Sequence, residues 1–419
     1  MFIYCGPFNT VCKSLLLFTM NSLRNRSLLF VLCITFLLFG CHKDDDVTGP
    51  HTILTLQVDA EYPLYTDTWI FATNDGGEVL DVKSYTAGET VTLTSANAGD
   101  KINVTFFNHR ETPSKTSYFV TYADVPAGTE LHLAASSSSS PELGPCTAKF
   151  KISNYSYSTT SLDFSNTGSG TGTAAGGVLD MDFSFYGPSD ILISGYCKGV
   201  PVFNWARGVK NGDVVTRDFD ADFATFPHQR KLDFSGKNRG FVYGVDADGG
   251  YRSVLDTYLL SGIYKTDQPI LGYIDGFDSY DMTVISDKSN GSISYHNTGE
   301  PDLTFTMPNA FSFSLRSNGM QDLSFNFSED YTYYYSIWTY TQDSESIKWF
   351  FYGPAGVSVK GMSMPSEIAA KYPQVNVSKF THASIDFIKI VEGGSYLESI
   401  LGATSDHKTR KEYSYQPNL

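Results

Sequence analysis

Short stretches of alternating apolar and polar residues recur along the chain from Ile53 onward. About seven such stretches fall between Ile53 and Leu133, each bounded by Gly, Asn, Asp or Pro. Successive side chains of a strand point to opposite faces, so this alternation predicts half-buried β-strands. Seven short strands close most naturally as a small β-sandwich. We therefore expect residues 52–135 to form an immunoglobulin-like (Ig-like) or transthyretin-like sandwich.

A Ser-rich segment at residues 136–145 separates this region from the rest of the chain and is predicted to be a linker. Beyond it the strand patterns are longer and more aromatic. A repeat occurs in this part: Phe185–Pro188 and Phe351–Pro354 both read Phe-Tyr-Gly-Pro and are followed by alternating Ile or Val. The repeat predicts a strand, a turn and a second strand in each copy. We expect two larger antiparallel β-sandwich units, residues 146–290 and 291–419.

Local turn and cap signals add a hairpin and two short helices. Alternating apolar residues over Phe311–Leu315 and Leu323–Phe327 flank an Asn-Gly pair, which predicts a β-hairpin. One helix is expected from Pro365 to the residue before Pro373, and another at Ser395–Gly402, where Ser395 and Glu398 form a capping box. The predicted fold class is all-β with a few short helices.

The composition agrees with a folded β protein and excludes one class of partner. Aromatic residues make up 15% of the chain and charged residues only 18%, with a formal net charge of −15. Aromatic side chains suit a pleated, half-buried surface. A negative chain with no basic stripe is repelled by phosphate backbones, so we expect no nucleic-acid partner.

The N-terminal forty residues have the organisation of a secretory signal. Arg24 and Arg26 precede an apolar run over Leu28–Phe39, which ends at Gly40 and Cys41. This run is shorter than the roughly 20 residues that a membrane-spanning helix needs. Residues 1–40 are therefore predicted to be a signal peptide, and Met20 to be its true start, since the signal is complete from there.

The Leu-Phe-Gly-Cys sequence at residues 38–41 resembles the lipobox of bacterial lipoproteins, in which the cysteine is acylated and becomes the mature N-terminus. The resemblance implies lipidation of Cys41 and anchoring to a membrane. Residues 41–51 then form an acidic tether, in which Lys43 and Asp44–Asp46 resemble the export signal of Bacteroidetes surface lipoproteins. It implies an outer-membrane protein displayed on the cell surface; the alternative is retention on the periplasmic face.

Cysteines and acids offer few further sites. Cys146 and Cys197 would be a single pair in an oxidising compartment, which predicts either a disulfide or two buried thiols. Asp246 and Asp248 form a weak calcium candidate, and an ordinary Asp-Gly turn is the alternative. We expect no metal centre and no cofactor.

Three alternating carboxylates, Asp218, Asp220 and Asp222, are predicted on one face of a strand. We interpret that face as solvated. No facing acid or nucleophile accompanies them, so the chain is not expected to be an enzyme.

Aromatic residues crowd the stretch from Tyr331 to Tyr340. Alternation places Tyr331, Tyr333, Tyr335 and Ile337 on one face of a strand and Tyr334, Trp338 and Tyr340 on the other. One face can be core, and an exposed row of rings would stack on the apolar faces of sugars. We therefore predict a ligand-binding platform at Tyr334, Trp338 and Tyr340, with Trp205 as a weaker addition. The alternative is a strand packed between two layers.

The overall layout resembles Bacteroidetes surface lipoproteins, although the specific motifs cover only the first 46 residues. Some members capture glycans beside an outer-membrane transporter, and others are fimbrial subunits that assemble by strand exchange. The resemblance therefore implies a non-catalytic lipoprotein that binds glycans or other extracellular ligands, with a transporter as a further partner. A structural or adhesive subunit is the alternative, and a polysaccharide-active enzyme has the least support.

Overall fold

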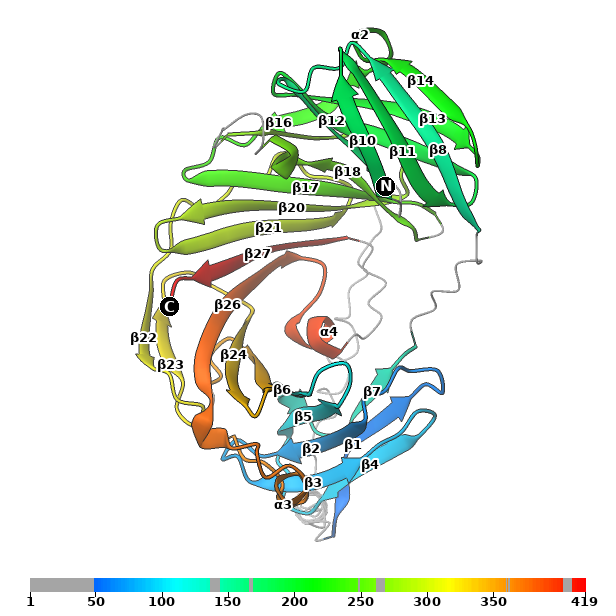
Figure 1. Cartoon of the computed structure of the whole chain (residues 1–419). Coiled ribbons are helices and arrows are strands. Elements are labelled where there is room, and N and C mark those ends of the chain that lie inside the picture. Colours follow the sequence, from blue (N-terminus) through cyan, green and yellow to red (C-terminus); the bar gives the residue numbers. More distant parts are fainter. Residues whose placement is uncertain are drawn as a thin grey trace, which may run out of the picture. The chain divides into compact units, whose positions relative to one another are not determined.

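The computed structural model is built almost entirely of strands, which confirms the predicted all-β class (Figure 1). It describes residues 49–135, 144–165, 169–247, 249–260, 268–358, 360, 362–401 and 409–419. Cys41, the signal segment and most of the tether and Ser-rich linker lie outside these residues. Within the described ranges no helix has the length and apolarity needed to cross a membrane.

A twelve-stranded sheet dominates the structure, and its strands come from both ends of the chain. All neighbouring strands are antiparallel except β25 and β6, which are parallel over Ser346–Tyr352 and Thr116–Tyr122. In spatial order the strands are β18 (Tyr251–Asp256), β17 (Lys237–Val245), β20 (Ser279–Lys288), β21 (Gly291–Gly299), β27 (Arg410–Pro417), β26 (Thr381–Glu392), β24 (Tyr333–Gln342), β25 (Glu345–Pro354), β6 (Thr116–Pro126), β5 (Lys101–Arg110), β2 (Asp67–Thr73) and β3 (Val79–Ser84).

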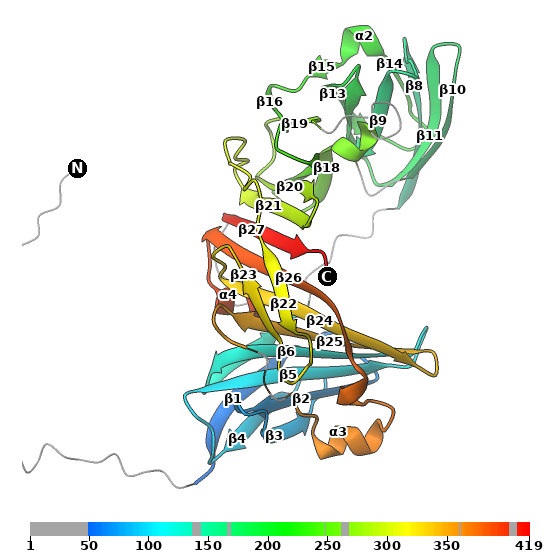
Figure 2. The same cartoon turned by 90° about the vertical axis from the view of Figure 1, so that its left-hand side faces the viewer.

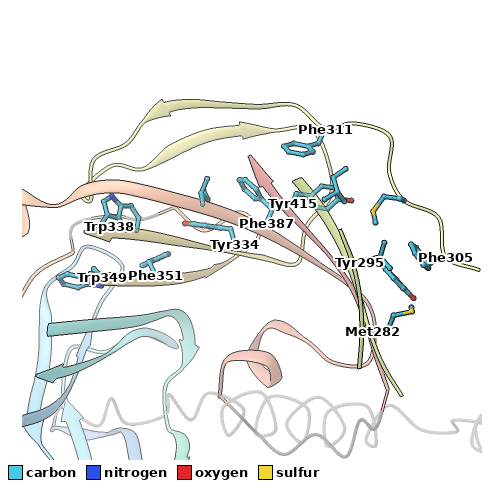
Figure 3. Packing of buried hydrophobic residues seen from close by; sticks show 14 of the residues in the cluster. Met282, Tyr295, Phe305, Phe311, Tyr334, Trp338, Trp349, Phe351, Phe387 and Tyr415 are labelled. Atoms are coloured by element: carbon cyan, nitrogen blue, oxygen red, sulfur yellow. The ribbon is translucent and has the colours of Figure 1, made fainter. Parts of the chain in front are cut away.

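Alternation along these strands gives the sheet two different faces. One face, here called the covered face, carries the largest buried rings of the molecule, among them Trp338, Trp349, Phe351 and Phe387 (Figure 3). The other face, here called the open face, carries half-buried side chains over β6, β25 and β24. A strand needs only one apolar face to join a core, and the open face is covered only in part by other elements.

A three-stranded sheet packs on the open face over β2 and β5, the strands from the N-terminal region (Figure 2). Its order is β4 (Thr90–Ser95), β1 (His51–Val58) and β7 (Thr129–Leu133). Leu54 and Leu56 of β1 pack with Ile70 of β2 and Val104 of β5 in a separate core. This is the predicted small sandwich, with one difference: its second layer continues into the large sheet.

A second sandwich follows, formed by two four-stranded sheets around their own core of Phe150, Phe183, Ile191 and other residues. Its first sheet has the order β10 (Ser169–Ala175), β11 (Val178–Tyr186), β8 (Pro145–Ser153) and β14 (Val214–Asp218). The other has the order β15 (Ala224–Thr225), β13 (Val200–Val209), β12 (Ser189–Cys197) and β9 (Thr160–Ser165).

The predicted hairpin is confirmed as β22 (Phe313–Ser317) paired with β23 (Ser324–Phe327). It lies over the covered face, where Phe327 stacks on Phe387 at 4.0 Å between ring centroids. The two helices predicted in the C-terminal part are also present, α3 (Ser366–Lys371) and α4 (Tyr396–Leu401). The remaining elements are α2 (Phe219–Asp222), the 3-10 helices Thr257–Leu260 and Val377–Lys379, and the pair β16 (His228–Lys231) with β19 (Ile270–Tyr273).

The sheet pairing does not follow the predicted domain boundaries. Asn290 and Gly291 lie at the turn of the β20–β21 hairpin, so a boundary there would divide a hairpin. The second Phe-Tyr-Gly-Pro copy also differs from the first. Phe185–Pro188 does join two strands, β11 and β12, whereas Phe351–Pro354 ends β25 and no strand follows over 355–358.

Of the two alternatives for Cys146 and Cys197, the disulfide is absent: both are free, half-buried thiols. Cys146 lies opposite Phe185, beside the turn that leads into β12. Cys197 is the last residue of β12, eight residues beyond its start. A strand of that length spans roughly 26 Å, so the two cysteines sit at opposite ends of the sandwich. Disulfide geometry needs Cα atoms within about 7 Å.

Candidate functional site

The aromatic platform predicted at Tyr334, Trp338 and Tyr340 is on the covered face, and the prediction is corrected here. Tyr334 and Trp338 have no exposed surface. The Tyr334 hydroxyl donates to the Val357 carbonyl at 3.0 Å, and the Trp338 indole N–H donates to the Asn318 carbonyl at 3.4 Å. The β22–β23 hairpin lies over this face (Figure 3), and residues from the segment around α3 join the same buried cluster, so no sugar can reach these rings.

Tyr340 and Trp205 are half-buried, and each ring is already occupied. The Tyr340 hydroxyl donates to the Gln374 carbonyl at 2.8 Å, and its ring packs edge-on against Phe380. The Arg207 guanidinium lies over the Trp205 ring, 3.8 Å from its centroid. A cation held over the indole is a favourable contact that a ligand would have to displace.

The acidic candidates have structural partners. Asp218 caps α2, accepting from the backbone N–H groups of Asp220 and Ala221, so this stretch is a helix start and not the predicted strand. Asp246 pairs with Arg252 at 2.5 Å. Asp248 lies outside the described residues. The described residues contain no group of three or more His, Cys, Asp or Glu placed to hold a metal ion.

Half-buried aromatic residues lie on the open face. On β24 these are the residues that alternate with Tyr334 and Trp338. Tyr335 of β24 stacks on Tyr352 of β25 at 5.6 Å, and Tyr352 contacts Tyr122 of β6 at 5.3 Å. Tyr122 in turn contacts Phe106 of β5, and Phe106 contacts Tyr85; these last two rings are buried. These five rings are called the tyrosine row. The row crosses four adjacent strands of one sheet.

A cavity of about 180 Å³ opens along the tyrosine row, where the three-stranded sheet stops covering the open face. Tyr62, Tyr85 and Tyr122 line it together with Asn108 and His132, and Ile400 of α4 forms part of its wall. Val120 also lines the cavity, and half-buried Tyr118 and Phe350 continue the open face beside it. In Figure 1, α4 lies near these strands; its Leu397 and Ile400, like Tyr335 and Tyr352, pack against a buried cluster of Tyr333, Ile388 and Tyr396.

The charge state of the cavity follows from its tyrosines. Burial raises the pKa of Tyr122 to about 12 and raises the pKa values of Tyr62 and Tyr85 as well. The phenols are therefore neutral at physiological pH and can both donate and accept. The Tyr85 hydroxyl donates to the Asn108 side chain at 3.3 Å. His132 lies 2.6 Å from the Asp59 carboxylate at the edge of the site, beside the apolar rings, the neutral phenols and the Asn108 amide.

Asp386 of β26 lies at the Tyr335 end of the tyrosine row and is 3% exposed. Burial raises the pKa of its carboxyl, while hydrogen bonds from Tyr335 and Gln416 lower it by a smaller amount. Its Oδ2 has no hydrogen-bond partner among the described residues. Buried carboxyl oxygens are normally paired, so this atom is an unusual feature of the sheet beneath the row.

The sequence-based prediction placed the platform on the face of β24 that is covered, whereas the half-buried rings lie on the other face. Tyr62, Tyr85 and Tyr122 carried no separate signal, because they come from the N-terminal region and reach Tyr352 only through the parallel pairing of β6 with β25. The alternation Tyr118-x-Val120-x-Tyr122 could have marked this face, but alternation alone does not say which side is covered.

Comparison with known proteins finds no matching family model, no similar curated protein and no similar solved structure.

Proposed function

We propose that the chain is a non-catalytic, lipid-anchored envelope protein that binds a glycan at the tyrosine row and its cavity. The observation that carries the proposal is the series of half-buried phenol rings on the open face, next to neutral hydrogen-bonding groups. Flat rings match the apolar faces of sugar rings, and phenol and amide groups match sugar hydroxyls. Neutral phenols fit an uncharged ligand.

Binding to a glycan array, followed by calorimetry with the best ligand, tests this proposal. Phe350→Ala and Tyr118→Ala remove half-exposed rings beside the cavity and should each weaken binding about tenfold or more, as expected for a stacking contact of more than 1 kcal/mol. Tyr251→Ala is the matched control, since Tyr251 is 61% exposed on β18, at the edge of the sheet. No binding on the array, or equal losses in all three variants, would count against the proposal.

The anchor is tested separately at Cys41. The lipobox-like sequence and the acidic residues after it support acylation and display on the outer membrane. Cys41→Ser should move the protein from the membrane fraction to the soluble fraction, and mass spectrometry of the wild-type protein should find acyl chains on Cys41. Proteolysis of intact cells distinguishes the cell surface from the periplasmic face. An unmodified Cys41 would exclude the lipoprotein assignment.

A further inference from the structure

A second cavity, also of about 180 Å³, lies on the covered face of the same sheet. Its floor crosses four adjacent strands, where Phe71, Thr105, Thr121 and Phe351 stand in register on β2, β5, β6 and β25. The two threonines are 2% and 3% exposed and interrupt an otherwise aromatic face. This cavity is separated from the tyrosine row by the thickness of the sheet.

Among the described residues, only one of the two threonine hydroxyl hydrogens on this floor has an assigned acceptor. The Trp349 indole N–H donates to Thr121 Oγ1 at 2.8 Å, and Thr121 Oγ1 lies 2.8 Å from Thr105 Oγ1. Each threonine has one hydroxyl hydrogen, and a single hydrogen serves the contact between them. Whichever threonine donates in that contact, the hydroxyl hydrogen of the other threonine is not used within the group of Trp349, Thr105 and Thr121. Buried donors are normally satisfied, so this hydrogen points to a missing acceptor.

Two irregularities in the strands shape the wall of the cavity. The register of β5 with β6 shifts between Ile102 and Val104, which places two residues of β6, Ala123 and Asp124, opposite the single residue Asn103 of β5. Its side chain accepts from the Asp124 N–H at 3.2 Å and donates to the Asn74 carbonyl at 3.3 Å. Asp124 has a φ of 62°, an unfavourable conformation for a residue with a side chain. Bulges of this kind re-aim side chains next to binding sites.

The rim of the cavity is polar and nearly balanced in charge. Asp75, Asp124, Ser358 and Lys360 line it, and Asp124 is paired with Lys101. Carboxylates accept from hydroxyl groups, and threonine, asparagine and lysine donate to them. The floor adds the apolar walls of Phe71 and Phe351. Together these groups fit a compact molecule with several hydroxyl groups and an apolar face.

We propose that this covered-face cavity is a second binding site, which takes one uncharged sugar ring or a polyol of similar size. The unused threonine hydrogen, Asn103 and the two rim aspartates would hold its hydroxyl groups. The proposal does not rest on the glycan site at the tyrosine row, because the two sites share no lining residue and lie on opposite faces of the sheet.

Titration of the purified protein with a panel of free monosaccharides and polyols, by calorimetry and ligand-observed NMR, tests this site. At least one member should bind. Thr121→Val removes the hydroxyl while keeping the shape of the side chain, and should weaken binding at least tenfold. Asp75→Asn changes an exposed turn residue and should weaken binding several-fold without altering the melting temperature. This variant therefore tests the site even if Thr121→Val is unstable.

Phe350→Ala, on the open face, is the control and should leave binding of the free sugar unchanged. The opposite pattern, loss in Phe350→Ala and retention in both cavity variants, would place the sugar at the tyrosine row and overturn the second site. Absence of binding by every member of the panel would overturn it as well. If Phe350→Ala loses glycan binding on the array but still binds the monosaccharide, the glycan and the free sugar bind at two different sites.

Discussion

At the scale of single residues, burial decides which aromatic side chains can meet a ligand. Trp338 packs among the rings of the covered face and has no exposed surface. Trp338→Ala should therefore lower the free energy of unfolding by about 3–5 kcal/mol, as expected for the loss of a buried aromatic side chain. Chemical denaturation measures this change. A loss of glycan binding with unchanged stability would contradict the assignment of Trp338 to the core.

His296 on β21 gives a pH dependence at the same scale. Burial alone would lower its pKa, but hydrogen bonds to Asp281 at 2.9 Å and to Glu412 outweigh burial and raise the pKa to about 9. Because the folded-state pKa exceeds the unfolded value of 6.5, the contribution to stability is complete below pH 6.5 and is lost as the pH rises through 9. The folded-state pKa of Glu412 is lower than the ordinary glutamate value of 4.5. Glu412 therefore stays charged, and its pair with His296 stays intact, as the pH falls to 4.5.

His296→Gln checks this dependence. The difference in unfolding free energy between wild type and variant should be largest near pH 6 and should shrink steadily towards pH 9. Denaturant titrations at pH 6, 7.5 and 9 give the three values. A difference that is constant across this range would show that His296 is not charged in the folded protein.

At the scale of elements, α4 borders the tyrosine row and is fastened by one hydroxyl group. The Tyr396 hydroxyl lies 2.8 Å from the carbonyl oxygens of Ala123 on β6 and Tyr352 on β25. Tyr396→Phe removes this donor, and we expect a loss of about 1 kcal/mol in stability and faster amide exchange over α4. Hydrogen-exchange mass spectrometry follows α4 directly. Unchanged protection in the variant would mean that packing of Leu397 and Ile400 alone holds the helix.

Most elements could be predicted from the sequence, because their signals are local. The β22–β23 hairpin follows from alternation around Asn318-Gly319, and α4 follows from Ser395 and Glu398. The site could not be predicted in the same way. Whether Tyr334 or Tyr335 meets solvent depends on the β22–β23 hairpin, which lies over one face of β24. Which strands join β24 and β25 depends on pairings more than two hundred residues apart, as between Phe119 and Trp349.

At the scale of the whole molecule, residues 52–135 are completed by strands from the other end of the chain. Phe71, Phe107 and Phe119 have no exposed surface, and Phe119 stacks on Trp349 at 4.3 Å. Ser117 donates to Glu345 at 2.5 Å. Without β25, the N-terminal region would expose these rings and leave β6 as an unpaired edge, which is a template for aggregation.

A fragment of residues 49–135 should therefore be unable to fold as a stable monomer, although its sequence predicts a complete sandwich. We expect it to aggregate or to bind a hydrophobic dye and to unfold without a cooperative transition. The chain over residues 49–419 is the control and should unfold cooperatively in the same buffer. A fragment with dispersed NMR signals and a cooperative transition would instead show that the three-stranded sheet and its core are sufficient. In that case the pairing of β6 with β25 would be a docking contact between two domains that fold separately.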